Sequence, residues 1–248
     1  MKTIPEILNF FNDEQVFITT ESQPALTYAD LKRQVDYTKD FFNKNHIQKT
    51  DTIAIVCENG PVMATSFLAT ASNCCAAPLN PSYTSSEFDF YLEDLKPKAL
   101  IVKEDSNSPV IEVAIKRKIK IFNLLVNNKD PSGKFSLESK KENISHTINQ
   151  NDNIIPEDIA LILHTSGTTS KPKMVPLTHL NLCTSAKNIV QTLNLDRSDK
   201  CINIMPLFHI HGIVGLLLSS LFSGGNIFTS PGFNALKFFS WLKVFSPT

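Results

Sequence analysis

Short apolar runs alternate with amphipathic stretches along the chain, and this alternation predicts an α/β fold. We expect the apolar runs to be buried strands of mainly parallel sheets that carry helices on both faces. The expected strands are 53–57, 99–102, 121–126 and 159–163. The amphipathic stretches predict helices that begin after Thr27, at Pro61 and after Thr84, one near 109–118, and one over 178–193.

Two of these helices begin with residues that can cap the free N–H groups of a first turn. Thr27 is followed three positions later by Asp30, and Thr84 is followed in the same way by Glu87, so each pair can form a capping box. Pro61 suits the first turn of a third helix because its missing N–H is not needed there. Local signals and periodicity therefore predict the same helices.

The composition changes between Asn127 and Asn153, where Asn, Lys and Ser dominate and large apolar residues are few. Such a stretch predicts a long, mobile connection. We therefore expect one incomplete domain with two subregions, 1–126 and 154–248, joined by the polar connection 127–153.

Composition and charge argue against several classes of protein. The 248 residues include 24 Lys and Arg and 24 Asp and Glu, interspersed, so no nucleic-acid surface is expected. The first residues lack the features of a secretory signal, and the apolar stretch 213–222 is too short to span a bilayer. The five cysteines have an odd count and no zinc-site spacing, which favours a reducing compartment and a cytoplasmic location.

The segment HTSGTTSKPK, residues 164–173, lies between the expected strand 159–163 and the expected helix 178–193. It is predicted to be a strand-to-helix loop at the carboxyl end of a strand, where open parallel sheets bind ligands. Its hydroxyls, glycine and lysines suit a polyphosphate, although the pattern is not a Walker A sequence. The alternative is a solvent-facing Ser/Thr turn, and composition alone does not decide between the two.

The order of residues favours the phosphate site. The pattern T-S-G-T-T-x-x-P-K resembles the phosphate loop of AMP-forming adenylating enzymes, the superfamily of acyl-CoA synthetases, luciferases and peptide-synthetase adenylation domains. MPLFHIHG, residues 205–212, is similar to that family's next motif, and the segments 26–31 and 76–94 are similar to its N-terminal parts. Within the family, the motifs most resemble those of the oxalate–CoA ligases, neighbours of the 4-coumarate–CoA ligases.

The resemblance implies the N-terminal part of the large domain of the adenylate-forming fold and a reaction in two steps. A carboxylate attacks the α-phosphate of ATP, and the thiol of coenzyme A then displaces AMP from the acyl-adenylate. The residues implied to line the phosphates are Thr165, Ser166, Gly167, Thr168, Thr169 and Lys173. Lys173 is also a catalytic candidate, because such a loop stabilises charge that develops on the phosphates.

Two histidines of the second motif are candidate substrate-binding residues, and His209 is also a catalytic candidate. The resemblance implies that His209 lies beside the acyl carboxylate, whereas the alternative is a core histidine near a strand end. For oxalate, a small dianion, we expect His211 to donate a hydrogen bond to the second carboxylate. His-x-His on a strand could also bind a metal, but no third ligand has recognisable spacing and no metal site is expected. We expect His164 to pack at a strand end, and Cys74 and Cys75 to be buried and unreactive.

The chain departs from the family pattern in two ways. Met174 stands where the usual loop has glycine, and we expect its side chain to crowd the loop or to restrict a backbone angle. The family's later motifs, including a glutamate that helps to hold Mg²⁺, do not occur in the chain. The resemblance therefore implies part of an ATP-dependent acid–CoA ligase with an incomplete magnesium site, which we expect not to turn over alone.

Two alternatives stay open. One is a catalytically incomplete remnant that binds nucleotide or associates with another chain, and the other is an interaction protein whose loop no longer meets phosphate. The final helical pattern is heavily apolar, at Leu236, Phe239, Trp241, Leu242 and Phe245. We expect such a face to favour self-association or pairing with a complementary chain. A peroxisomal location also fits the family, but the chain carries no signal for it.

Overall fold

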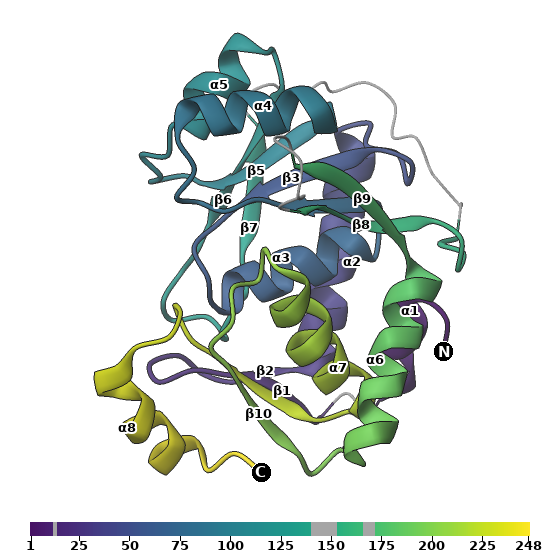
Figure 1. The fold of residues 1–248 in the computed structure, drawn as a ribbon, viewed down its shortest axis with the longest axis vertical. Helices are drawn as coiled ribbons and strands as arrows, with labels where there is room; N and C mark the ends of the chain where they lie inside the picture. The colour runs from purple at the N-terminus through teal and green to yellow at the C-terminus, as the bar shows by residue number, and fades with distance from the viewer. Residues whose placement is uncertain (12–13, 140–152, 166–171) are drawn as a thin grey trace.

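The computed structural model describes residues 1–11, 14–139, 153–165 and 172–248. Its strands form two sheets, and Figure 1 shows helices packed around and between them. In that view, the larger sheet occupies the upper half of the molecule and the smaller sheet the lower half, with α3 (Pro61–Ala71) and α7 (Ser219–Ser223) between them. The expected α/β fold of mainly parallel sheets is confirmed.

The larger sheet has the strand order β7-β6-β5-β3-β4-β8-β9. Its strands are β3 (Thr52–Val56), β4 (Cys75–Pro78), β5 (Ala99–Lys103), β6 (Lys120–Leu125), β7 (Ser136–Ser139), β8 (Ile159–Thr165) and β9 (Lys173–Thr178). The five inner strands are parallel to their inner neighbours, whereas β7 and β9 close the two edges in antiparallel pairing. The four apolar runs therefore all form strands of one sheet.

The smaller sheet has the order β10-β11-β1-β2 and joins distant parts of the sequence. Its strands are β1 (Val16–Thr19), β2 (Leu26–Thr27), β10 (Lys200–Asn203) and β11 (Asn226–Thr229). In the smaller sheet, β1 pairs in parallel with β11. In the larger sheet, β8 and β9 follow the 127–153 stretch in sequence, whereas β3 to β6 precede it. Both sheets thus combine strands from before and after the 127–153 stretch, so they do not coincide with the expected subregions 1–126 and 154–248.

The remaining helices are α1 (Ile4–Phe10), α2 (Tyr28–Lys44), α4 (Ser85–Leu95), α5 (Val110–Lys116), α6 (His179–Leu193), the π-helix η1 (His211–Leu218) and α8 (Ala235–Phe245). The capping boxes of α2 and α4 form as expected, and Pro61 begins α3. A third capping box joins Thr178 to Asn181 at the start of α6. It replaces the usual carboxylate by an amide, which is why the sequence pattern did not show it.

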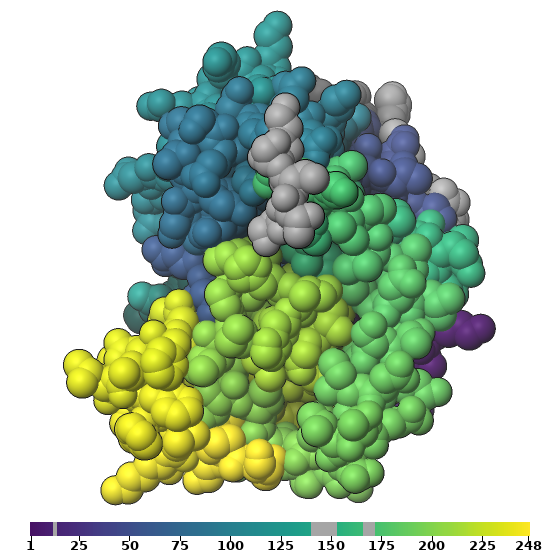
Figure 2. Space-filling model, viewed as in Figure 1, coloured from purple at the N-terminus to yellow at the C-terminus, as the bar shows by residue number. Residues whose placement is uncertain are grey.

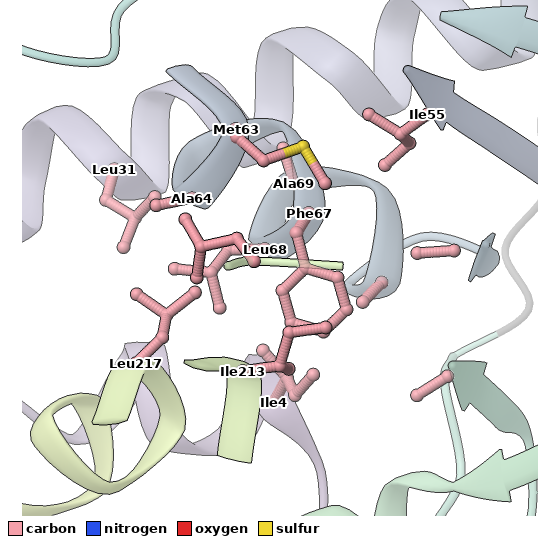
Figure 3. Packing of buried hydrophobic residues seen from close by; sticks show 14 of the residues in the cluster. Ile4, Leu31, Ile55, Met63, Ala64, Phe67, Leu68, Ala69, Ile213 and Leu217 are labelled. Atoms are coloured by element: carbon pink, nitrogen blue, oxygen red, sulfur yellow. The ribbon is translucent and has the colours of Figure 1, made fainter. Parts of the chain in front are cut away.

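The main core surrounds α3, whose residues 63–71 are all buried. Figure 3 shows Phe67 of this helix directed toward Ile4 of α1 and Ile213 of η1. All three side chains are fully buried. Burying a side chain of this size stabilises a protein by about 1.5–3 kcal/mol, so α3 anchors both neighbouring helices. The packing of α3 thereby fixes η1, which carries the second motif.

A second core cluster covers the other face of the larger sheet, between the strands and helices α4 and α5. Ile162 of β8 packs against this cluster, whereas its neighbours Leu161 and Leu163 belong to the main core. This alternation follows from the period of two in a strand, whose successive side chains point to opposite faces. It places the side chain of His164, two residues beyond Ile162, on the face that α4 covers.

Part of the expected polar connection 127–153 belongs to the larger sheet. Strand β7 pairs with β6, and both Phe135 and Leu137 are buried. The side-chain amide of Gln34 in α2 donates to the carbonyl of Phe135 at 3.1 Å and accepts from its N–H at 3.3 Å. These contacts fix residues 135–137 against α2, so only residues on either side of them can serve as a loop.

The cysteines are free, and Cys74 and Cys75 are buried as expected. Burial raises the pKa of the Cys75 thiol to about 12 and that of Cys57 to about 12 as well. A thiol with such a pKa holds its proton at neutral pH, so neither is a nucleophile. Within the described part of the chain, no helix combines the length and apolar character needed to cross a membrane.

Candidate functional site

Two of the residues implied to bind phosphate, Thr165 and Lys173, lie at the end of a β-hairpin where its two strands are connected. Strand β8 ends at Thr165, strand β9 begins at Lys173, and these two residues are direct partners in the antiparallel register. Ser166, Gly167, Thr168 and Thr169 lie outside the described residues. The expected strand-to-helix loop is wrong, because residues 173–178 form a strand before α6 begins.

Strand β9 is hard to detect in the sequence because it lies at the edge of the sheet. Three of its residues, Lys173, Met174 and Pro176, are exposed, so its apolar residues do not mark a buried strand. Pro176 has no N–H to donate to a neighbouring strand, and an edge strand tolerates proline for that reason. Pairing with β8, rather than its own composition, makes this segment a strand.

The hairpin brings Thr165 and Lys173 to the carboxyl end of β8, a strand that runs parallel to β4. Open α/β sheets bind ligands at this end of their strands. Residues opposite each other in an antiparallel pair share a face, so a hydroxyl and an ammonium group lie together there, both exposed. This pair can donate a neutral and a charge-assisted hydrogen bond to one anion.

Met174 pairs with His164 and therefore lies on the opposite face from Thr165 and Lys173. Its side chain is 42% exposed. A side chain in this register points away from the pair that could hold an anion, so the expected crowding does not arise at Thr165 and Lys173.

His164 packs at the end of β8, as expected, and also has a polar partner. Its side chain is 5% exposed, and its Nε2 lies 2.9 Å from Oδ2 of Asp94 in α4. The ring also makes a T-shaped contact with Tyr91 of α4, with ring centroids 4.7 Å apart. The last residue before the candidate phosphate pair is thus bound to a helix on the far side of the sheet.

The second motif, residues 205–212, is held by two side-chain amides at strand ends. Asn203, 1% exposed, accepts from the N–H of Met205 at 2.9 Å and donates to the carbonyl of Gly212 at 3.2 Å. Asn59, which follows β3, accepts from the N–H of Leu207 at 2.9 Å. Sequence reasoning missed both asparagines, although Asn203 ends a strand and Asn59 follows one.

His209 and His211 lie on a turn and a π-helix instead of the expected strand. Strand β10 ends at Asn203, and His211 is the first residue of η1. Gly212 permits the sharp turn of this segment, because a Cβ at this position would lie only 2.3 Å from the carbonyl oxygen of Pro206. Both histidines are exposed, so the alternative of a core histidine at 209 is wrong.

The ring of His211 lies against the backbone of η1, since a Cβ at Gly215 would be 2.9 Å from its Cδ2. The ring of His209 packs beside Phe208, with centroids 4.6 Å apart. Short π-helical segments are frequent at functional sites, where they re-aim side chains. Two exposed imidazoles on one turn can donate hydrogen bonds to an anionic ligand.

Figure 2 shows β9 and the start of η1 on the same face of the molecule. No hydrogen bond among the described residues joins Thr165 or Lys173 directly to His209 or His211. The two parts of the candidate site therefore lie on one face of the molecule, and no such hydrogen bond links them. In the described ranges, no group of three or more His, Cys, Asp or Glu side chains is arranged to hold a metal ion.

The arrangement of the two sheets is similar to that of several solved structures. MatB from Rhodopseudomonas palustris matches with a TM-score of 0.78 over 97% of this chain and 47% of that one, at 22% identity. The o-succinylbenzoate coenzyme A synthetase of Bacillus subtilis, solved in complex with ATP and magnesium ion, matches with a TM-score of 0.76 over 99% and 61%, at 20% identity. The fold is thus that of the N-terminal domain of adenylate-forming enzymes.

Residues 9–248 match the AMP-binding enzyme family, and the chain belongs to it. It is 35% identical to the oxalate–CoA ligase of Saccharomyces cerevisiae over 253 aligned positions, and 38% identical to that of Arabidopsis thaliana over 211. These alignments cover 92% and 82% of this chain but 47% and 40% of the two relatives. The chain thus spans less than half the length of these relatives, as the resemblance implied.

Proposed function

We propose that this chain is the N-terminal part of an ATP-dependent, AMP-forming carboxylic acid–CoA ligase. The observation that carries the proposal is the pairing of Thr165 with Lys173 at the carboxyl end of β8, exposed and on one face. In the reaction, the substrate carboxylate attacks the α-phosphate of ATP and pyrophosphate leaves with its bonding electrons. The thiol of coenzyme A then attacks the acyl carbon, and AMP leaves.

In this proposal Thr165 and Lys173 hold the departing phosphates. Phosphoryl-type transfer needs little covalent help from the protein, so charge stabilisation and positioning are the main contributions of such groups. Lys173 supplies a full positive charge, and Thr165 supplies a directional hydroxyl donor. Ser166, Gly167, Thr168 and Thr169 extend the same site in our proposal.

We further propose an oxalate-like small acid as the substrate, because two exposed imidazoles share one turn. His209 would lie beside the reacting carboxylate, and His211 would donate to the second carboxylate of a dianion. The oxalate–CoA ligase relatives support this choice. ATP would be bound together with Mg²⁺, as in the Bacillus subtilis structure in complex with ATP and magnesium ion, and in our proposal this chain supplies only part of the magnesium site.

Replacing Lys173 by alanine should weaken the binding of ATP and of pyrophosphate by about tenfold or more, since a charged hydrogen bond contributes roughly 1.5–3 kcal/mol. Isothermal titration calorimetry of the purified chain measures this directly. Lys187→Ala is the matched control, because it removes the same charge from an exposed position on α6.

Equal affinities for the Lys173 and Lys187 variants would show that the hairpin is a surface turn. A folded wild-type chain that takes up neither ligand would favour the interaction-protein alternative. Weak binding of ATP without acid-dependent AMP formation, even with the remaining part of a ligase added, would favour a nucleotide-binding remnant.

We also propose that α8 pairs with a complementary protein surface, either in another copy or in a further part of the enzyme. Leu236 is 94% exposed and Phe239 is 76% exposed, although only scattered apolar side chains are usually left in water. The double change Leu236→Gln and Phe239→Gln should abolish concentration-dependent association in sedimentation velocity. The control is Leu193→Gln, at a residue of α6 that is 62% exposed. Association that survives the double change would contradict this role.

A further inference from the structure

The end of β8 is tied to helix α4 by a polar contact that the proposed function does not use. His164 is the residue directly before Thr165, and its Nε2 lies 2.9 Å from the carboxylate of Asp94. The histidine side chain is 5% exposed and that of Asp94 is 41% exposed. A buried polar ring is costly unless it finds a partner, so the carboxylate strongly favours this one ring position.

The surroundings of the ring restrict it further. Tyr91 and Asp94 are three residues apart on α4 and therefore present neighbouring side chains on one face of the helix. Tyr91 makes a T-shaped contact with the His164 ring, and Tyr83 stacks on Tyr91 with centroids 4.6 Å apart. Tyr83 in turn packs against Phe88, which is fully buried in the second core cluster. The histidine is thus held by a hydrogen bond and by a supported aromatic wall.

The register of the hairpin carries this restraint to the candidate phosphate pair. His164 precedes Thr165 in β8, and its partner Met174 follows Lys173 in β9. Because successive residues point to opposite faces, a strand held by His164 on the α4 face has Thr165 and Lys173 fixed on the other. We propose that Asp94, acting through His164, is a positioning residue that orders Thr165 and Lys173 for binding of the ATP phosphates. This inference rests on the proposed function.

The hydrogen bond between His164 and Asp94 is here called the clamp. Two substitutions at His164 distinguish this polar clamp from simple packing of the ring. His164→Phe keeps an aromatic ring beside Tyr91 and removes the hydrogen bond to Asp94. His164→Gln loses the ring and keeps an N–H donor that can reach the carboxylate. The clamp predicts that Phe weakens pyrophosphate binding about tenfold, whereas Gln retains most of it. A packing role predicts the reverse order.

A double-mutant cycle tests whether Asp94 acts through His164. Asp94→Asn should weaken pyrophosphate binding about threefold in the wild-type background and should have no effect in the His164→Phe background. The control is Glu93→Gln, which removes a neighbouring carboxylate on α4 that pairs with Arg117 instead of β8. Equal effects of Asp94→Asn in both backgrounds, or an equal effect of Glu93→Gln, would overturn the proposal.

The clamp and the phosphate site can fail separately. If the folded wild-type chain binds neither ATP nor pyrophosphate, the proposed function fails. The clamp is then tested separately, by amide hydrogen exchange in the β8–β9 hairpin. The clamp predicts that His164→Phe and Asp94→Asn each raise exchange at Thr165 and Val175 by about tenfold, while Glu93→Gln leaves it unchanged. Unchanged exchange in all three variants would overturn the clamp whatever the chain binds.

Discussion

Replacing Gly212 by alanine should destabilise the protein by about 3 kcal/mol or more and should disorder the second motif. An added Cβ would lie 2.3 Å from the carbonyl oxygen of Pro206 and 2.9 Å from its carbonyl carbon. Both are backbone atoms, so the clash can be relieved only by moving the chain around residues 205–206. Urea denaturation, followed by circular dichroism, measures the lost free energy of unfolding.

The displacement should spread because the same backbone forms the hydrogen bonds of Asn203. This side chain bridges the N–H of Met205 and the carbonyl of Gly212, and it is almost fully buried. Breaking the bridge would leave buried polar groups without partners, which costs roughly 1–3 kcal/mol for each group. Stability and the geometry of His209 should therefore be lost together.

Gly215→Ala is the matched control, four residues from His211 on the same π-helix. Here the added Cβ would meet Cδ2 of the His211 ring at 2.9 Å, and a side chain can rotate away. Alanine also favours helices over glycine by roughly 1 kcal/mol, which offsets the cost of moving the ring. The free energy of unfolding should therefore change little. If Gly212→Ala proved as stable as Gly215→Ala, the close approach at residue 206 would not constrain the turn.

The elements that could be predicted from the sequence are those whose signal is local. The run 53–57 became β3 at Thr52–Val56, and 159–163 became part of β8, because inner strands with both faces covered are apolar almost throughout. The capping boxes at Thr27 and Thr84 formed because a threonine and an acid three residues later suffice for them.

The missed elements depend on partners far away in the sequence. Strand β1 is four residues long and is stabilised by β11, whose first residue lies more than two hundred positions later. Half of the residues of strand β9 are exposed and one of them is a proline, so only its pairing with β8 makes it extended. The π-helix η1 includes close contacts of Gly212 with the backbone of Pro206 and of Gly215 with the ring of His211, which no periodicity records.

In the candidate site, too, some residues have a local sequence signal and others are identified only by the fold. The motifs singled out Thr165, Lys173, His209 and His211 by residue type and order, without information on how they would be held. Asn59 and Asn203 hold the backbone of the second motif, and Asp94 binds His164 beside Thr165. Both asparagines and the aspartate come from other parts of the chain. A single asparagine or aspartate at a strand end or on a helix face has no distinctive sequence signal, so only the fold identifies these roles.

One further buried histidine controls stability. His179 begins α6 and is fully buried, and its Nδ1 accepts a hydrogen bond from the N–H of Ile4 at the start of α1. Burial lowers its pKa from 6.5 to about 4, against the opposing attraction of Asp158 and Glu6. The ring is therefore neutral in the folded protein at neutral pH, as its acceptor role at Nδ1 requires.

The stability of the chain should fall by about 3 kcal/mol between pH 6.5 and pH 4 because of His179 alone. The unfolded chain binds a proton on this ring below pH 6.5, whereas the folded chain does so only below about pH 4. The contribution is therefore complete above pH 6.5 and is lost as the pH falls through that window. Urea denaturation at a series of pH values measures the slope, which should include about 1.4 kcal/mol per pH unit from this group.

His179→Asn isolates the effect, since Oδ1 of asparagine can accept from the N–H of Ile4 but does not titrate. The free energy of unfolding of this variant should fall less steeply between pH 6.5 and pH 4, because its unfolding takes up one proton fewer per molecule. His46→Asn removes a histidine from the turn after α2, where asparagine tolerates the left-handed backbone, and should keep the wild-type slope. If both variants lost stability along the wild-type curve, burial of His179 would not be the source of acid sensitivity, and carboxylates that titrate in the same range would have to supply it.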